Sequence, residues 1–208
     1  ANAARCRPAF LPKGTQVEQA VPSDQEAARG ACPSRAAGRS TGGAAPDLPL
    51  RNQCPQRPQV DHVERLALSK ARSAAGRHAR GTVLGADTAV VVDGRLLGKP
   101  ADLSHARDML QLLSGRRHQV LSAVAVVKDR QAVAVSDSSV WFRALSEKDI
   151  EDYWKSGEPR DKAGAYGIQG VGAIFVERLE GSYSGVMGLP LYETARLLQG
   201  FGIRVLEQ

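Results

Sequence analysis

An ionisable aspartate interrupts the most apolar stretch of the sequence. Asp87 lies within residues 82–92, a run rich in Val, Leu and Ala. Burying a charge without a partner is strongly unfavourable, so this carboxylate needs either local hydrogen bonds or a function. The structural interpretation is an aspartate that caps a turn or bonds to nearby backbone. The functional interpretation is a carboxylate that binds a metal ion or acts as a general base at a break in the strand, as phosphate chemistry requires.

Two further features could act on a ligand that contains phosphate. Lys99 lies between a glycine and a proline, where the backbone is restricted and the ammonium group offers a point charge to a phosphate. Glycines at 164, 167 and 170 form a tight loop that carries Gln169. Their spacing matches neither a P-loop nor a dinucleotide-binding fingerprint. Gln169 can therefore pair with the edge of a base or simply tie the loop together.

An alternating order of helices and strands must position these side chains. Apolar residues at 63, 66, 67 and 71 predict one face of a helix, with Lys70 beside that face. Residues 82–92 predict a buried strand that ends in the turn pair Asp93 and Gly94. The remaining patterns predict a helix over 103–113, strands over 119–128 and 132–143, a helix from a capping box at 146–149 to about 157, a strand over 173–178, a loop over 181–188 and a helix over 191–198. This order predicts an α/β fold.

The first sixty residues differ in composition from the rest of the chain. They hold eight of the eleven prolines, and eight Arg or Lys against four Asp or Glu. We therefore predict a Pro/Ala/Arg-rich segment of low order over 1–60 and one domain over 61–208. Most of the net charge of +6 arises in the first segment, so the folded part has no basic face. Nucleic-acid binding is not favoured, because the basic segment also lacks aromatic stacking residues.

The cysteines and the hydropathy pattern exclude several classes of protein. Cys6, Cys32 and Cys54 lack the spacing of a zinc site, and their odd number without a secretory signal argues against a disulfide framework. No run approaches the roughly 18 consecutive apolar residues of a membrane span. We therefore expect a soluble cytoplasmic protein with no membrane partner.

Several short motifs occur together in an order that points to one family. They are Gly-Ala-Asp-Thr (85–88), Gly-Lys-Pro (98–100), Leu-Ser-Gly-Arg (113–116), His-Gln-Val (118–120), Asp-Lys-Ala-Gly-Ala-Tyr-Gly-Ile-Gln-Gly (161–170), Gly-Ser-Tyr (181–183) and Gly-Leu-Pro-Leu (188–191). Over residues 62–203 the chain resembles the Maf-like nucleotide pyrophosphatases. The resemblance implies a Maf/ITPase-like mixed twisted sheet flanked by helices. It also implies hydrolysis of a nucleoside triphosphate to the monophosphate and pyrophosphate, with a divalent metal cation (Mg²⁺ or Mn²⁺), and leaves a homodimer open.

The resemblance also assigns roles to individual residues. Asp87 matches the catalytic proton acceptor of the family and is a candidate metal ligand. Lys70 and Lys99 match its phosphate-binding lysines, whereas Thr88 and Gln169 match positions associated with substrate choice. The Tyr-Gly-Ile-Gln-Gly sequence resembles the subgroup that acts on dTTP and UTP, with modified pyrimidine nucleotides as further candidate substrates. A glutamine amide suits a pyrimidine edge because it both donates and accepts hydrogen bonds.

The first sixty residues depart from the family pattern. Family members begin with a strand and a Ser-x-Ser-Pro-Arg-Arg turn that grips the triphosphate, and Cys-Pro-Ser-Arg at 32–35 is the nearest fragment here. Two origins stay open, a divergent segment and one translated in a shifted reading frame, and the nucleotide sequence separates them. A second function also stays open: a catalytically impaired relative that binds nucleotide or a cell-division partner without turnover.

Overall fold

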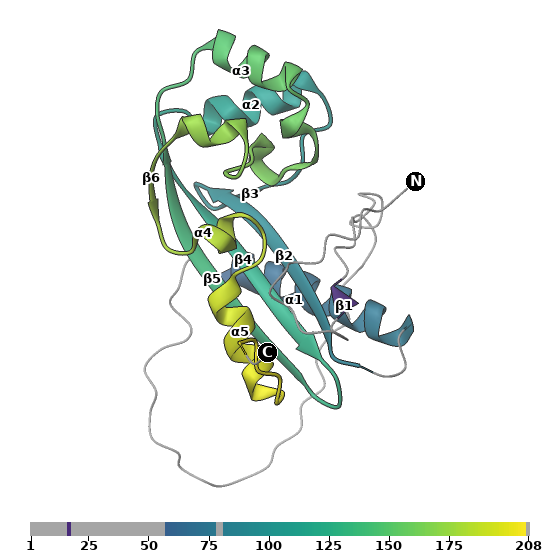
Figure 1. The fold of residues 1–208 in the computed structure, drawn as a ribbon. Coiled ribbons are helices and arrows are strands. Elements are labelled where there is room, and N and C mark those ends of the chain that lie inside the picture. Colours follow the sequence, from purple (N-terminus) through teal and green to yellow (C-terminus); the bar gives the residue numbers. More distant parts are fainter. Residues whose placement is uncertain (1–15, 18–56, 78–80, 207–208) are drawn as a thin grey trace, which may run out of the picture.

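The structure is a computed structural model that describes residues 16–17, 57–77 and 81–206 (Figure 1). The predicted segment 1–60 and the three cysteines lie almost wholly outside these residues, so the division at residue 60 stays a prediction. Helix α1 (Arg57–Arg77) begins slightly ahead of that division. In the part of the chain that the structure describes, no helix is long and apolar enough to cross a membrane.

A six-stranded mixed sheet forms the centre of the molecule. The strands are β1 (Gln16–Val17), β2 (Val83–Val92), β3 (Arg95–Leu97), β4 (Arg117–Val127), β5 (Gln131–Phe142) and β6 (Val176–Glu180). Strands β2, β4, β5 and β6 pair antiparallel in that order, whereas β1 runs parallel to the start of β2. Strand β3 folds back on the end of β2. The mixed α/β fold predicted from the sequence is therefore confirmed.

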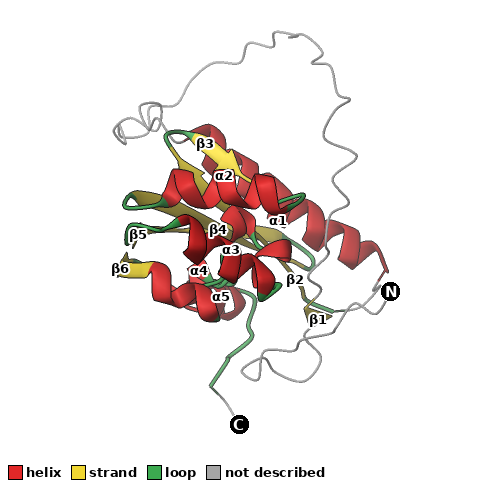
Figure 2. Ribbon diagram, turned by 90° about the horizontal axis from the view of Figure 1, so that it is seen from above, coloured by secondary structure: helices red, strands yellow, loops and turns green. Residues whose placement is uncertain are grey.

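Helices cover both faces of this sheet (Figures 1 and 2). On one face, Val63, Ala67 and Ala71 of α1 pack against alternate residues of β2 and β4 such as Leu121. On the other face, Leu198 of α5 (Leu191–Gly200) packs against Leu84 and residues of β4. Because side chains alternate along a strand, odd-numbered residues of β2 face α1 and even-numbered residues face α5.

The largest core cluster lies at the end of the sheet where α2 (Leu103–Leu113) and α3 (Glu147–Lys155) gather (Figure 1). The residues predicted to point inward from α2 are all buried: Ala106, Met109, Leu110 and Leu113. The predicted capping box is also present, because the Ser146 and Asp149 side chains each bond to the other residue's backbone N–H. Three 3₁₀ turns complete this end of the molecule: η1 (Glu158–Asp161), η2 (Ala163–Ala165) and η3 (Val171–Phe175).

Two local predictions were wrong, and one short strand was missed. Strand β6 begins only at Val176, because residues 171–175 form η3, whose first N–H groups bind a carboxylate. The expected loop over 181–188 contains a short helix, α4 (Tyr183–Val186), which the Ser182 hydroxyl caps by accepting from Gly185 N. Strand β3 was not predicted, although Asp93 and Gly94 take the positive φ angles (49° and 74°) of a tight hairpin turn.

Candidate active site

The carboxylate of Asp87 forms an ion pair with Lys70. Lys70 Nζ lies 2.7 Å from Asp87 Oδ1, and it also donates a hydrogen bond of 3.3 Å to the backbone oxygen of Ala86. The two side chains are mostly buried, with exposed fractions of 18% for Lys70 and 11% for Asp87. The cost of placing a carboxylate in an apolar strand is thus offset by a partner of opposite charge.

A close approach of α1 to β2 makes this ion pair possible. Lys70 precedes Ala71, which is fully buried against the sheet, so the lysine lies at the margin of the helix–sheet contact. A Cβ atom at Gly85 would lie 2.5 Å from Ala67 O and 2.6 Å from Ala71 N. Because glycine has no such atom, the helix backbone can approach β2 closely enough for Lys70 to reach Asp87.

Asp87 lies on a stretch of β2 whose outer edge is unpaired among the described residues. Strand β1 pairs with β2 at Val83 and Leu84, and β3 pairs with it at residues 90–92. Between these two short strands, no described residue pairs with the outer edge of residues 85–89, whereas β4 pairs with their inner edge.

Thr88 points to the opposite face of the sheet from Asp87. Its hydroxyl oxygen lies 2.8 Å from the Ser122 Oγ on the neighbouring strand and donates a longer hydrogen bond of 3.5 Å to Gly188 O. Ser122 in turn donates to Gly185 O at 2.6 Å. Thr88 thus contacts the segment that links α4 to α5, and it does not join the Asp87–Lys70 pair.

The turn with Lys99 and the loop with Gln169 are held together through their backbones. Gly164 N donates to Gly98 O at 2.9 Å, and a Cβ at Gly164, whose φ is 70°, would collide with the side chain of Val90 on β2. Lys99 and Gln169 are both exposed, and neither side chain bonds to another described residue. Both polar groups therefore remain available to a ligand near the end of β2.

With this geometry in view, comparison with known proteins identifies the family. Residues 38–201 match the sequence profile of a family described as Maf-like protein. The chain belongs to the Maf-like family. This Maf-like chain is 60% identical over 121 residues to the dTTP/UTP pyrophosphatase of Alkalilimnicola ehrlichii, a match covering 58% of the chain and 60% of that relative.

Two other relatives match longer parts of the Maf-like chain. It is 53% identical over 155 residues to the dTTP/UTP pyrophosphatase of Hahella chejuensis, covering 73% of the chain and 77% of the relative. It is 50% identical over 158 residues to the protein of the same name from Vibrio parahaemolyticus, covering 75% and 83%. All five candidate residues lie inside the region that matches the family.

Two side chains that shape the glycine-rich loop of the Maf-like chain were missed at the sequence level. Glu158 accepts hydrogen bonds from Val171 N and Gly172 N, and Tyr153 Oη accepts one from Gly167 N. A glutamate between Gly157 and Pro159, just before a glycine-rich stretch, is the signal that could have found Glu158. No periodicity marks Tyr153 as more than a core residue of α3.

The site offers a single carboxylate to a metal ion. Within the described ranges, no group of three or more His, Cys, Asp or Glu side chains could hold a metal. Mg²⁺ is commonly bound through one or two carboxylates together with substrate phosphates. Asp87 therefore fits an ion that a triphosphate would share with the protein, and the described residues do not form a complete metal cage.

Proposed function

We propose that this Maf-like protein hydrolyses dTTP and UTP, and modified pyrimidine nucleotides of the same kind, to the nucleoside monophosphate and pyrophosphate. The observation that carries the proposal is the partly buried Asp87–Lys70 pair on the free edge of β2. The names of the similar proteins from three bacteria support the same substrates. The geometry supplies both a base and a cation next to a surface that a ligand can reach.

The two lysines act on the triphosphate in this proposal. An ammonium group has three donors, so Lys70 can keep its bond to Asp87 while it donates to a phosphate oxygen. Lys99 adds a second charge from the turn that follows β3. Positive charges placed near the phosphates stabilise the negative charge that develops on the phosphoryl oxygens.

Asp87 acts on the attacking water. Its carboxylate accepts the proton of that water, and its ion pair with Lys70 holds it in orientation. A bound Mg²⁺ or Mn²⁺, held by Asp87 and the triphosphate, would supply further neutralisation of phosphate charge. Gln169 reads the base, because its free amide can match the alternating carbonyl and N–H groups of a pyrimidine edge.

Thr88 influences substrate choice indirectly in this proposal. Its hydroxyl bonds to Ser122 and Gly188, on the face opposite Asp87, so it fixes the backbone between α4 and α5. A nucleotide that crosses the free edge of β2 would place its phosphates near Asp87 and its nucleoside on the Thr88 face.

A homodimer is part of the proposal as well, and light scattering coupled to size exclusion tests it.

Release of pyrophosphate from dTTP, UTP and GTP, with added Mg²⁺ or Mn²⁺, tests the proposed activity. We expect turnover of the two pyrimidine nucleotides and its loss by roughly 10²–10⁴-fold in Asp87→Asn, the range of general acid–base catalysis. Asp93→Asn is the matched control: it removes the same charge from an exposed residue of the adjoining turn, paired with Arg116. Equal activity of the Asp87→Asn and wild-type proteins would contradict the assignment of the base.

A second function competes with hydrolysis. Among the described residues of the site, Lys70 and Lys99 are the two cations that can bind phosphate, and the family's arginine-rich turn has no match in the sequence. A protein with this reduced charge could bind a pyrimidine nucleotide without cleaving it. Saturable binding of dTTP by calorimetry, with no pyrophosphate released by the folded wild-type chain, would favour this function.

A further inference from the structure

Two side chains hold the backbone of the glycine-rich loop from one side. Glu158 Oε2 accepts from Val171 N at 2.8 Å, and Glu158 Oε1 accepts from Gly172 N at 3.1 Å. Tyr153 Oη donates to Glu158 Oε1 at 2.8 Å and accepts from Gly167 N at 3.0 Å. The hydroxyl and the carboxylate thus form one connected unit that binds three backbone N–H groups on both sides of Gln169.

Glycines at 170 and 172 leave room for Glu158 and Tyr153. A Cβ at Gly170 would collide with the Glu158 carboxylate, and a Cβ at Gly172 would lie 2.5 Å from Tyr153 Oη. The N–H groups at 167, 171 and 172 already bind Tyr153 and Glu158, so they are not free to cradle a phosphate. The glycines at 167, 170 and 172 therefore make room for two protein side chains.

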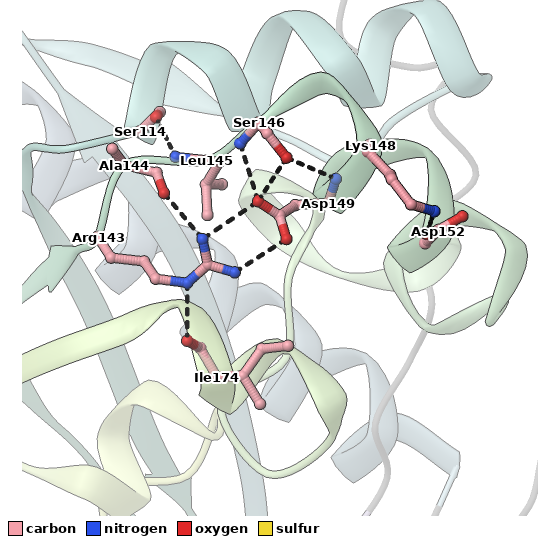
Figure 3. A network of polar contacts seen from close by, with 9 residues as sticks. All are labelled: Ser114, Arg143, Ala144, Leu145, Ser146, Lys148, Asp149, Asp152 and Ile174. Atoms are coloured by element: carbon pink, nitrogen blue, oxygen red, sulfur yellow. Dashed lines mark hydrogen bonds and ion pairs between the residues drawn. The ribbon is translucent and has the colours of Figure 1, made fainter.

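The charge of Glu158 matches its position at the start of η3. A carboxylate at the N-terminal end and a guanidinium at the C-terminal end both complement the peptide dipoles of a helical turn. At the other end of η3, the Arg143 side chain donates to Ile174 O and its backbone N donates to Phe175 O. Figure 3 shows that the same guanidinium binds both oxygens of Asp149, in the capping box of α3.

The hydrogen bonds to Glu158 also favour its ionised form. Burial alone would raise the pKa of this carboxyl group, but the bonds from Tyr153, Gly172 and Val171 together hold the pKa below its usual value. Glu158 therefore stays negatively charged at neutral pH and accepts from all three donors at once. A neutral side chain of the same size cannot do so, because a glutamine amide turns one of its two acceptors into a donor.

We propose that Glu158, acting with Tyr153, is a positioning residue that sets nucleotide selectivity by fixing the backbone on which Gln169 is carried. Gln169 is exposed and bonds to no other described residue, so the backbone of residues 167–172 sets the position from which its side chain extends. This inference rests on the proposed function, because it assigns to Gln169 the reading of a pyrimidine base. Glu158 itself touches neither the substrate nor Asp87.

The experiment compares Glu158→Gln and Tyr153→Phe with the wild-type chain. We expect Glu158→Gln to raise KM for dTTP roughly tenfold with a much smaller change in kcat, the effect of losing one or two hydrogen bonds to a charged acceptor. The preference for dTTP over GTP should fall by a similar factor. Tyr153→Phe keeps the ring in its core contacts and should produce the same pattern to a smaller degree. Glu151→Gln is the matched control, since that exposed carboxylate of α3 pairs with Arg107 and does not contact the loop.

Amide hydrogen exchange provides a second measurement that does not depend on turnover. The amides of 167, 171 and 172 should exchange faster in Glu158→Gln than in Glu151→Gln, whereas amides of β4 should exchange equally. If the wild-type chain hydrolyses dTTP and Glu158→Gln keeps the same KM and selectivity, the inference is overturned and the proposed function stands. If the wild-type chain shows no turnover, the proposed function fails. Unchanged exchange at those three amides would also overturn the inference that Glu158 and Tyr153 fix the backbone of the loop.

Discussion

The ion pair between Asp87 and Lys70 affects both the stability of the fold and the chemistry proposed for the site. An unpaired carboxylate in β2 would be costly, and an unpaired ammonium on the buried margin of α1 would be costly too. Each side chain therefore stabilises the other before any ligand binds. In the proposed mechanism the same arrangement places the base beside a phosphate-binding cation, with the two groups 2.7 Å apart in the folded chain.

A double-mutant cycle measures this mutual dependence. Lys70→Met and Asp87→Asn should each lower the free energy of unfolding by about 1–3 kcal/mol, because each leaves a mostly buried polar group without its partner. The double variant should lose less than the sum of the two, with a coupling energy of about 1–2 kcal/mol. Urea unfolding curves provide the values. Arg72→Met is the control on the same helix, because Arg72 bonds to Gln131 at the exposed surface, and additive losses for Lys70 and Asp87 would contradict the coupling.

At the scale of the element, the distance between α1 and β2 decides whether the site exists. Gly85 is the residue that permits this distance, since a Cβ there would strike the backbone of the helix and not a flexible side chain. Overpacking of this kind cannot be relieved by a rotamer change, so the helix itself must move. Any such shift separates Lys70 from Asp87.

Gly85→Ala should therefore affect both stability and activity. We expect the free energy of unfolding to fall by about 1–3 kcal/mol and pyrophosphate release to fall at least tenfold, measured by urea unfolding and by the activity assay. Gly76→Ala, near the end of α1, is the control. No described atom lies within 4 Å of a Cβ at this position, so the variant should be neutral or stabilise α1 by up to about 1 kcal/mol. Full activity in Gly85→Ala would show that the helix can shift without harm.

The sequence predicted long periodic elements well and short capped elements poorly. The buried residues of α2 and the capping box of α3 follow directly from apolar spacing and side-chain type. Helix α4 and turn η3 depend on caps supplied by Ser182 and Glu158, which act through hydrogen bonds that no hydrophobic period records. Strand β3 is only three residues long and has no pattern of its own.

In the candidate site, too, the sequence indicated single residues but not the contacts that depend on packing. Asp87 could be singled out because a charge in an apolar strand needs a partner, but the identity of that partner depends on the packing of α1 against β2. Strand alternation could have predicted that Thr88 faces away from Asp87. The flanking Gly157 and Pro159 could have marked Glu158, but not its role, because two of its three donors are backbone N–H groups 13 and 14 residues further along the chain.

At the scale of the whole molecule, an aromatic cluster joins the sheet to the glycine-rich loop. His118 of β4 is 2% exposed and contacts the rings of Phe142 and Tyr166, with centroid distances of 4.9 and 5.4 Å. Its Nε2 lies 2.8 Å from Tyr166 Oη, and its buried Nδ1 has no hydrogen-bond partner among the described residues. A second proton on the imidazole ring would place a charge inside this cluster, next to the loop that carries Gln169.

This buried histidine makes the stability of the whole chain depend on pH. Burial lowers the pKa of His118 from 6.5 to about 4, so between these values the unfolded chain binds a proton that the folded chain does not. The free energy of unfolding should therefore be highest above about pH 6.5 and decline as the pH falls towards 4, with this residue contributing on the order of 3 kcal/mol.

Urea unfolding at a series of pH values between 4 and 8 measures the decline, and His118→Gln isolates the share that belongs to this residue. The variant should be less stable than the wild-type chain at neutral pH, because it loses ring contacts in the core, but the difference should shrink steadily towards pH 4. His105→Gln is the control, since that exposed ring stays in contact with water in the folded chain. A constant difference between wild type and His118→Gln over the whole range would mean that the pKa of His118 is the same in the folded and unfolded chains, which would contradict the effect of burial.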